Sequence, residues 1–206
     1  MGRIFLIRHG ATAWSYGDQR FCGSTDLELS DAGLREAELV ADRLATEPLA
    51  AVYATSLIRS RQTAEAIAAR HGLPVQAVAE LREANFGEWE GLNYAEIVER
   101  YPELNAARAR NPAEAAPPGG EDLHQVTARA VPAFLILAER HREEEIVVVG
   151  HNTINRVLLC HLLDMPLENY KRILQSPAAV NVLEFADGVV RVITINDTCH
   201  LEPAKR

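Results

Sequence analysis

The chain alternates between short apolar runs and longer stretches in which apolar and polar residues are mixed. Six short segments rich in β-branched and aliphatic residues predict strands at residues 3–7, 51–54, 75–78, 146–149, 180–185 and 189–195. Most of them are apolar without interruption. Such runs indicate strands buried on both faces, as in the central sheet of an α/β protein, rather than a sandwich with one wet face.

The longer stretches carry apolar residues at helical spacing. The first opens at Ser30 and is expected to bury one stripe, formed by Leu34, Ala37, Val40, Ala41 and Leu44. Further helices are predicted at 59–71, 123–142 and about 153–163, with Gly72 ending the first of these and Pro132 kinking the second. Alternating strands and helices predict parallel pairing with right-handed crossovers. Asp187-Gly188 predicts a hairpin between the last two strands, so at least one edge pair is antiparallel.

Residues 84–122 do not follow this alternation. Asn93 and Glu96 have the spacing of a capping box, and a run rich in proline and glycine follows at 112–122. We interpret the segment as an insertion over the sheet, within a single domain that covers residues 1–206.

Composition restricts the partners. The chain has 206 residues, 48% of them hydrophobic, which is enough for one substantial core. Its 29 acidic and 21 basic residues give a net charge of −8, which disfavours nucleic acid and anionic membranes as partners. An anionic ligand therefore needs a local basic pocket. Cys22, Cys160 and Cys199 lack metal-ligand spacing and form no closed disulfide set, and the N-terminal apolar run is too short for a secretory or membrane segment, so we expect a cytoplasmic protein.

Two histidines directly follow predicted strands. Arg8-His9-Gly10 comes after the first strand, and Gly150-His151-Asn152 comes after the fourth and precedes a helix. Either group alone is more simply read as polar residues at a strand end. However, the carboxyl ends of parallel strands share the edge where α/β proteins bind ligands. The N-terminus of the helix at His151 favours an anion, and Gly10 would allow a ligand to approach the backbone closely.

An arginine and a glutamate are expected at the same edge. Arg59 lies near the start of the helix after the second strand, where a cation opposes the helix dipole unless an anion is bound there. Arg61 is expected to be solvated. Glu83 stands between the third strand and the insertion, whereas nearby carboxylates such as Glu88 and Glu90 are expected to be surface charges.

The chain contains, in order, RHGATAW (8–14), GSTDLELSDAG (23–33), SLIRSRQTA (56–64), LREANFGEWEGL (81–92), PPGGED (117–122) and VVVGH (147–151). With these motifs it resembles the histidine phosphatase superfamily, in its phosphoglycerate-mutase-like branch. The resemblance implies a three-layer α/β/α sandwich with a mostly parallel central sheet, one antiparallel edge pair and a small lid formed by about residues 84–122.

The resemblance also implies roles for individual residues. His9 would be the nucleophile, Glu83 the proton donor, and Arg8, Arg59 and His151 would hold the phosphoryl oxygens. Additional substrate contacts are expected from Thr12, Ser15, Gly23, Asn152 and His200. Ser15 replaces a usual asparagine and Asn152 a frequent glycine, which bears on specificity rather than on the reaction.

The expected function is hydrolysis of a phosphomonoester through a phosphohistidine intermediate. Arg8 and Arg59 should lower the pKa of His9 so that it can attack, and two guanidiniums with an imidazolium at His151 should replace Mg²⁺ in stabilising charge, so neither a metal nor a cofactor is expected. The substrate would be a small phosphorylated metabolite such as phosphoserine or α-ribazole phosphate. A cofactor-dependent phosphoglycerate mutase and a non-catalytic module that binds phosphorylated ligands remain alternatives, and a homodimer is possible.

Overall fold

The computed structural model describes residues 1–201, which fold around one six-stranded sheet in the order β3-β2-β4-β1-β5-β6. The strands are β1 (Gly2–Arg8), β2 (Leu49–Ala54), β3 (Val75–Ala77), β4 (Glu145–Gly150), β5 (Val180–Ala186) and β6 (Val189–Asp197). Strands β3, β2, β4 and β1 are parallel, and β5 runs antiparallel to both β1 and β6. The mostly parallel sheet with an antiparallel edge pair is therefore confirmed. At the predicted hairpin, Asp187 and Gly188 have φ values of 54° and 78°, the left-handed conformation that such a turn requires.

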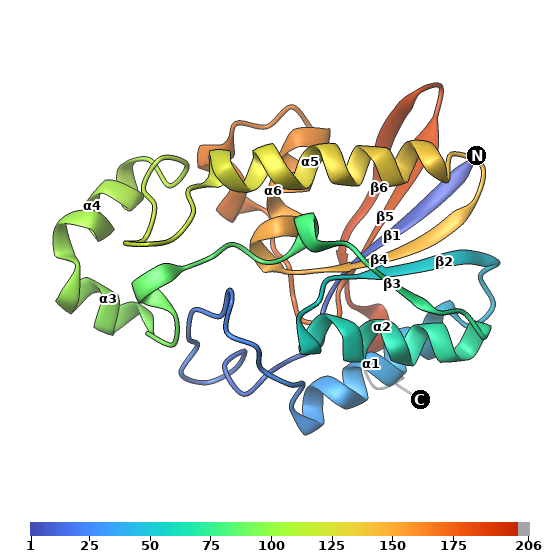
Figure 1. The fold of residues 1–206 in the computed structure, drawn as a ribbon, viewed down its shortest axis with the longest axis horizontal. Coiled ribbons are helices and arrows are strands. Elements are labelled where there is room, and N and C mark those ends of the chain that lie inside the picture. Colours follow the sequence, from blue (N-terminus) through green and yellow to red (C-terminus); the bar gives the residue numbers. More distant parts are fainter. Residues whose placement is uncertain (202–206) are drawn as a thin grey trace.

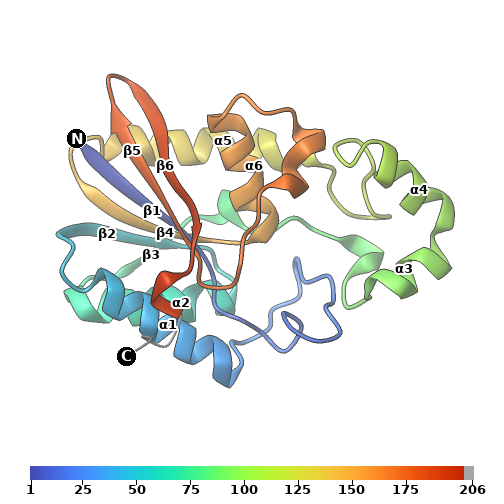
Figure 2. The same ribbon diagram turned by 180° about the vertical axis from the view of Figure 1, so that it is seen from behind.

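Helices cover both faces of the sheet, which gives the expected three layers. Figures 1 and 2 show α1 (Asp31–Leu44) and α2 (Ile58–His71) on one face, and α5 (Leu123–Arg140) and α6 (Asn152–Leu162) on the other. Alternate side chains of β1 enter two separate cores. Phe5 and Ile7 pack on the side of α1 and α2, whereas Ile4 and Leu6 pack with α5 and α6. Burial on both faces explains the uninterrupted apolar runs of the central strands.

One helical prediction is wrong in detail. Leu34 is 46% exposed, and the buried stripe of α1 runs through Gly33, Ala37, Val40, Ala41 and Leu44. Ser30 caps the helix by accepting a hydrogen bond from the Gly33 amide, and Gly33 packs against the backbone of Ala11 so closely that no side chain would fit. The helix therefore approaches the sheet through Gly33. In the layer opposite, α5 continues as one helix through Pro132.

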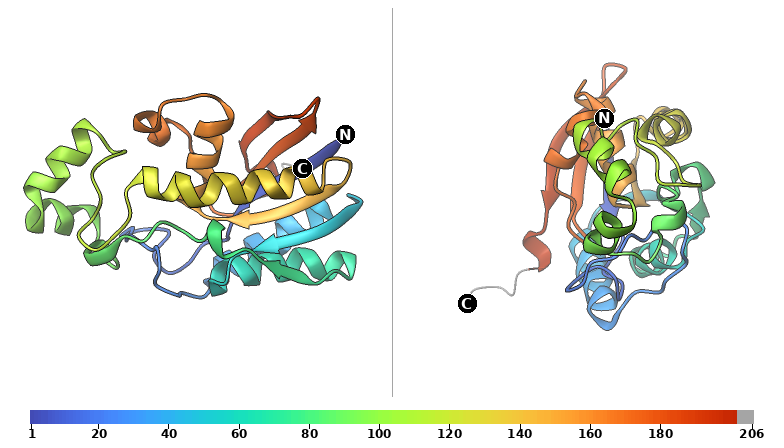
Figure 3. Two further views of the ribbon diagram at one scale, coloured as in Figure 1. Left: turned by 45° about the horizontal axis from the view of Figure 1, so that its top comes forward. Right: turned by 90° about the vertical axis from the view of Figure 1, so that its left-hand side faces the viewer.

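Residues 84–122 form η2 (Gly87–Trp89), α3 (Tyr94–Arg100) and α4 (Pro102–Arg110). The predicted capping box is present, with hydrogen bonds running both ways between Asn93 and Glu96. Figure 3 shows α3 and α4 extending away from the sheet, beyond the end at which β2 and β4 finish. Shorter elements are η1 (Ala79–Leu81), η3 (Leu167–Arg172) and η4 (Cys199–Leu201).

Candidate active site

The sheet brings His9 and His151 together. Strands β1 and β4 are parallel neighbours whose final residues, Arg8 and Gly150, lie opposite each other. The next residue of each chain segment is a histidine, and the centroids of the two rings are 5.2 Å apart. The adjacency follows from the strand order, which sequence periodicity alone does not provide.

His9 is oriented by its own backbone. Its Nδ1 lies 2.7 Å from the carbonyl oxygen of Gly10, and because a carbonyl can only accept, Nδ1 carries the hydrogen. The lone pair of the neutral ring is then on Nε2. Burial lowers the pKa of His9 well below its usual value, and the nearby Arg59 and Arg8 guanidiniums lower it further. His9 is therefore a neutral imidazole at pH 7, with a nucleophilic nitrogen in the cavity described below.

His151 is fully buried. Its Nε2 lies 2.9 Å from Thr55 Oγ1, whereas its Nδ1 is buried without a hydrogen-bond partner. Burial lowers the pKa of His151 well below its usual value, followed by the effects of Arg59, His9 and Arg8. The expected imidazolium at this position is therefore opposed by its surroundings, because the site already holds two guanidiniums. A phosphoryl anion would act in the other direction and raise this pKa.

Arg8 and Arg59 approach the histidines from two elements. Arg8 ends β1 and donates to the carbonyl of Gln175 at 2.6 Å, and burial lowers its pKa to about 10. Arg59, in the first turn of α2, is fully buried and donates to the carbonyls of Thr25 and Gly23 at 2.8 and 2.7 Å. The Nε atom of each arginine is buried without a partner. A buried polar group left unpaired costs about 1–3 kcal/mol, so these donors suit an oxyanion.

Glu83 is 3% exposed and is held at the start of α6. Its carboxylate oxygens accept hydrogen bonds from the amides of Thr153 (3.0 Å), Ile154 (3.3 Å) and Ala84 (2.8 Å). The helix N-terminus that we expected to favour an anionic ligand thus binds this side chain. Arg82 is exposed and pairs with Glu121 instead, so Glu83 is not a surface ion-pair partner of its neighbour.

A cavity of about 650 Å³ opens at this edge of the sheet. Among the expected site residues, those that line it are Arg8, His9, Thr12, Ser15, Glu83 and Asn152. The Thr12 and Ser15 hydroxyls lie 3.2 Å apart, and the Thr12 amide donates to Ser15 Oγ, so the two fix their own turn. Arg59 and His151 have no exposed surface and do not line the cavity as it stands.

The structure places one histidine and two glycines differently from the sequence-based expectation. His200 does not line the cavity: its ring nitrogens lie 3.0 Å from Arg43 Nη1 and 3.1 Å from the Ala178 carbonyl oxygen. Gly23 does not line it either, and contributes the carbonyl that receives Arg59. A Cβ on Gly10 would lie 2.5 Å from the carbonyl oxygen of Gly33, so the absence of a side chain serves packing against α1 rather than access for a ligand.

Several residues around this site were not expected there from the sequence. Glu90, expected at the surface, accepts hydrogen bonds from the backbone amides of Gly23, Ser24, Thr25 and Phe86 and from the Thr25 hydroxyl. Basic residues missed in the cavity lining are Arg20, Arg108, Arg156 and Lys171. Arg156 follows Asn152 by four residues and shares its face of α6, which was a usable signal. For Arg108 and Lys171 the sequence carried no such signal.

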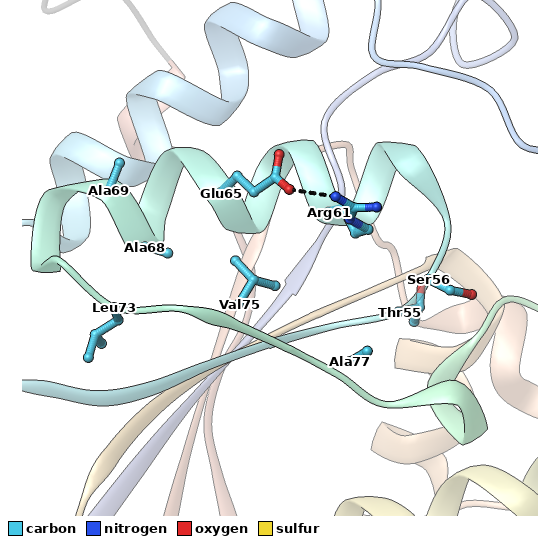
Figure 4. Close-up of a pocket in the computed structure, with 9 residues that line it drawn as sticks. All are labelled: Thr55, Ser56, Arg61, Glu65, Ala68, Ala69, Leu73, Val75 and Ala77. Atoms are coloured by element: carbon cyan, nitrogen blue, oxygen red, sulfur yellow. Dashed lines mark hydrogen bonds and ion pairs between the residues drawn. The ribbon is translucent and has the colours of Figure 1, made fainter.

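A second cavity of about 590 Å³ lies between α2 and β3 (Figure 4). Its charged lining residues are Arg61 and Glu65, which pair with each other at 3.0 Å, and both are exposed. The expectation that Arg61 is solvated is confirmed. With its charges already paired, this cavity offers an anion less than the one at His9.

Residues 1–201 hold neither a metal-binding cluster nor a membrane-spanning helix. Residues 1–201 contain no group of three or more His, Cys, Asp or Glu side chains that could hold a metal ion. No helix in the same range is long and apolar enough to cross a membrane.

The chain matches the model of the histidine phosphatase superfamily (branch 1) over residues 4–198. It is 35% identical to phosphoglycerate mutase-like protein 4 of Arabidopsis thaliana, covering 97% of this chain and 86% of that protein. It is 30% identical to phosphoserine phosphatase 1 of Hydrogenobacter thermophilus, covering 98% and 95%. The solved structure of Bacillus stearothermophilus YhfR superposes with a TM-score of 0.91 at 28% identity, over 98% of this chain and 100% of that one. The chain therefore belongs to branch 1 of the histidine phosphatase superfamily.

Proposed function

We propose that this protein is a phosphomonoester hydrolase that transfers the phosphoryl group of a small metabolite first to His9 Nε2 and then to water. The observation that carries the proposal is the state of His9, whose Nδ1–H is held by Gly10 while its pKa is lowered. In addition, a buried side-chain nitrogen without a hydrogen-bond partner is present in each of Arg8, Arg59 and His151. This combination suits a nucleophile next to an oxyanion site.

The first half-reaction forms the phosphohistidine. Arg8, Arg59 and His151 bind the phosphoryl oxygens, and His9 Nε2 attacks phosphorus as the bond to the alcohol oxygen breaks. Glu83 enters this step as the protonated acid and delivers its proton to the leaving alkoxide, which becomes the free alcohol. The phosphorylated ring keeps its Nδ1–H, and the Gly10 carbonyl stabilises the positive charge that the ring then carries.

The second half-reaction releases phosphate. Glu83, now a carboxylate, accepts a proton from water, and the resulting hydroxide-like oxygen attacks phosphorus while the bond to His9 Nε2 breaks. A mutase would use the same residues but return the phosphoryl group to another hydroxyl. One relative is named as mutase-like and another as a phosphatase, so the acceptor must be tested directly.

The test is rapid-quench kinetics with p-nitrophenyl phosphate in the presence of EDTA. We expect a burst of nitrophenolate, an acid-labile phosphoryl group on His9 by mass spectrometry, and continued release of inorganic phosphate. Activity lost in chelator and restored by a divalent ion would overturn the metal-independent mechanism. Transfer only to an added alcohol would indicate a mutase. Binding of phosphate without any phosphoenzyme would indicate a non-catalytic module.

A further inference from the structure

Three cations converge on the side of the cavity formed by α4, α6 and η3. Arg108 comes from α4, Arg156 from α6 and Lys171 from η3, and all three line the same cavity as His9. Arg108 donates to the hydroxyl of Tyr170 at 3.0 Å, and the Arg156 guanidinium lies 5.9 Å from the centroid of the Tyr170 ring. Both guanidiniums therefore lie beside Tyr170.

These cations have no directly paired carboxylate within residues 1–201; burial lowers the pKa of Arg156 and outweighs the charge of Glu83, which raises it. None of them takes part in an ion pair there, and the carboxylate in the cavity lining, Glu83, is held by the backbone of α6. The Nε atom of Arg156 is buried without a hydrogen-bond partner. Burial, followed by the charges of Arg108 and Arg156, lowers the pKa of Lys171, so both guanidiniums disfavour the charge of Lys171.

Another cation in the lining shows the contrast. Arg20 pairs with Asp18 at 2.6 Å and with Glu96 at 3.0 Å, so its charge is compensated by carboxylates of the protein. Although the chain has a net charge of −8, no carboxylate of residues 1–201 lies within ion-pair distance of Arg108, Arg156 or Lys171. Like charges held together without a carboxylate are costly unless a ligand supplies the anion.

Geometry also favours an anion there. The Arg108 guanidinium lies 5.1 Å from the centroid of the Trp89 ring, and Trp89 is 1% exposed. Stacking on an aromatic face fixes the plane of a guanidinium and leaves its edge for a planar or tetrahedral oxyanion. The cluster lies in one cavity with the phosphoryl site, so one small molecule can contact both.

We propose that the substrate carries a second oxyanion, a carboxylate or a second phosphate, which Arg108, Arg156 and Lys171 bind while His9 attacks the first. The inference rests on the proposed phosphatase function and narrows its substrate class. It favours acidic phosphoesters such as phosphoserine over α-ribazole phosphate, in which the phosphate is the sole anionic group.

The test compares matched substrates. 3-Phosphoglycerate and glycerol 3-phosphate differ in a carboxylate, and fructose 1,6-bisphosphate and fructose 6-phosphate differ in a phosphate. We expect wild-type kcat/KM to favour the acidic member of at least one pair by about tenfold or more, and which pair shows the preference identifies the oxyanion. Arg156→Gln and Lys171→Met should each remove most of that preference, because KM should rise much more for the member with two anionic groups than for the member with one. Arg191→Gln, which removes an exposed cation from β6, is the matched control.

Equal rates on both members of both pairs, or an equal loss on both members in the variants, would overturn the proposal. Calorimetric binding separates it from failure of the phosphatase function. His9→Ala cannot form the phosphohistidine but keeps the cluster, so it should bind 3-phosphoglycerate or fructose 1,6-bisphosphate more tightly than the matched ester that carries a single anionic group. Adding Arg156→Gln should abolish that difference. If no ester is hydrolysed but the binding difference persists, the phosphatase function fails and the oxyanion site stands.

Discussion

The two ends of the cavity are built in different ways. At the end around His9, the functional residues follow directly from strands or begin helices, so the hydrogen-bonded sheet fixes their backbone. At the other end, Arg108, Arg156 and Lys171 come from α4, α6 and η3, which no shared sheet holds in register. Under the proposed function, the reaction chemistry would lie at the sheet edge and recognition on the connecting segments, an arrangement that would let specificity vary around a constant reaction.

The largest difference between the two ends should appear on removing the nucleophile. His9→Ala should lower turnover by about 10⁴-fold or more with every substrate, because no other group can form the covalent intermediate. The fold should persist, since His9 follows β1 and is not among the apolar core residues. Steady-state kinetics and a thermal melt measure both effects.

The matched control is His161→Ala, which removes an exposed histidine from α6. It should leave the rate unchanged. A few per cent of wild-type activity remaining in His9→Ala would remove His9 from the role of nucleophile.

Next in size is the effect of Glu83→Gln. For alkyl phosphates the rate should fall by about 10²- to 10⁴-fold, because the alkoxide leaves poorly without a proton. For p-nitrophenyl phosphate, phosphoryl transfer should slow far less, because nitrophenolate leaves without protonation, and phosphoenzyme should accumulate since water is no longer activated. Single-turnover kinetics with both substrates measures the two steps.

Glu88→Gln is the control for this variant, since Glu88 is exposed five residues away. A uniform drop for both leaving groups, with no trapped phosphohistidine, would contradict an acid–base role for Glu83. A loss of stability without that substrate dependence would instead reflect the hydrogen bonds from Thr153 and Ile154.

The contrast between the two ends also explains what could be predicted from sequence. Periodicity located every strand to within two residues. For the central strands the reason is burial on both faces, whereas the edge strands β3 and β6 are partly exposed. The proximity of Arg8, His9 and His151 could be predicted because each lies at a strand end, where position along the chain translates directly into position in space.

Residues whose role depends on packing between distant segments could not be assigned in this way. Glu90 reads as one carboxylate among several, and only the fold brings the loop at Gly23 to it. Arg108 and Lys171 are separated from His9 by segments without sheet register, so nothing in their spacing places them in its cavity. His200 was expected at the substrate pocket from the resemblance alone, and the structure places its ring nitrogens against Arg43 and the Ala178 carbonyl.

Glu90 allows a smaller test of the end around His9. Its carboxylate holds the backbone of Gly23 and Thr25, whose carbonyls in turn hold Arg59. Burial raises the pKa of Glu90, but hydrogen bonds from Thr25, Ser24, Gly23 and Phe86 outweigh that effect and lower it overall. Glu90 is therefore a positioning residue for Arg59.

Glu90→Gln should destabilise the protein by about 1–3 kcal/mol, because in either orientation the amide NH₂ faces backbone N–H donors. We expect kcat to fall by about tenfold for alkyl and nitrophenyl esters alike, since Arg59 acts on the phosphoryl group that they share. Urea unfolding and steady-state rates check this, with Glu88→Gln again as the control. Wild-type rates in a destabilised protein would show that the loop is structural only.

The last test concerns stability rather than turnover, namely how the free energy of unfolding depends on pH through the histidines at the end around His9. The pKa values of His9 and His151 are lowered well below the usual value in the folded protein, mainly by burial, whereas in the unfolded chain both should titrate near 6.5. As pH falls below about 6.5, the unfolded state therefore binds protons that the folded state does not, and the free energy of unfolding decreases. Each histidine contributes a slope of up to about 1.4 kcal/mol per pH unit, so the pair should cost about 2–3 kcal/mol between pH 7 and 5.5. Urea unfolding across pH 5–7 measures the slope. Replacing the imidazole in His9→Asn should reduce the slope by up to about 1.4 kcal/mol per pH unit, the share of one histidine. Parallel curves for the wild type and His9→Asn would mean that His9 is not held neutral, and with it the physical basis for its nucleophilicity would be lost.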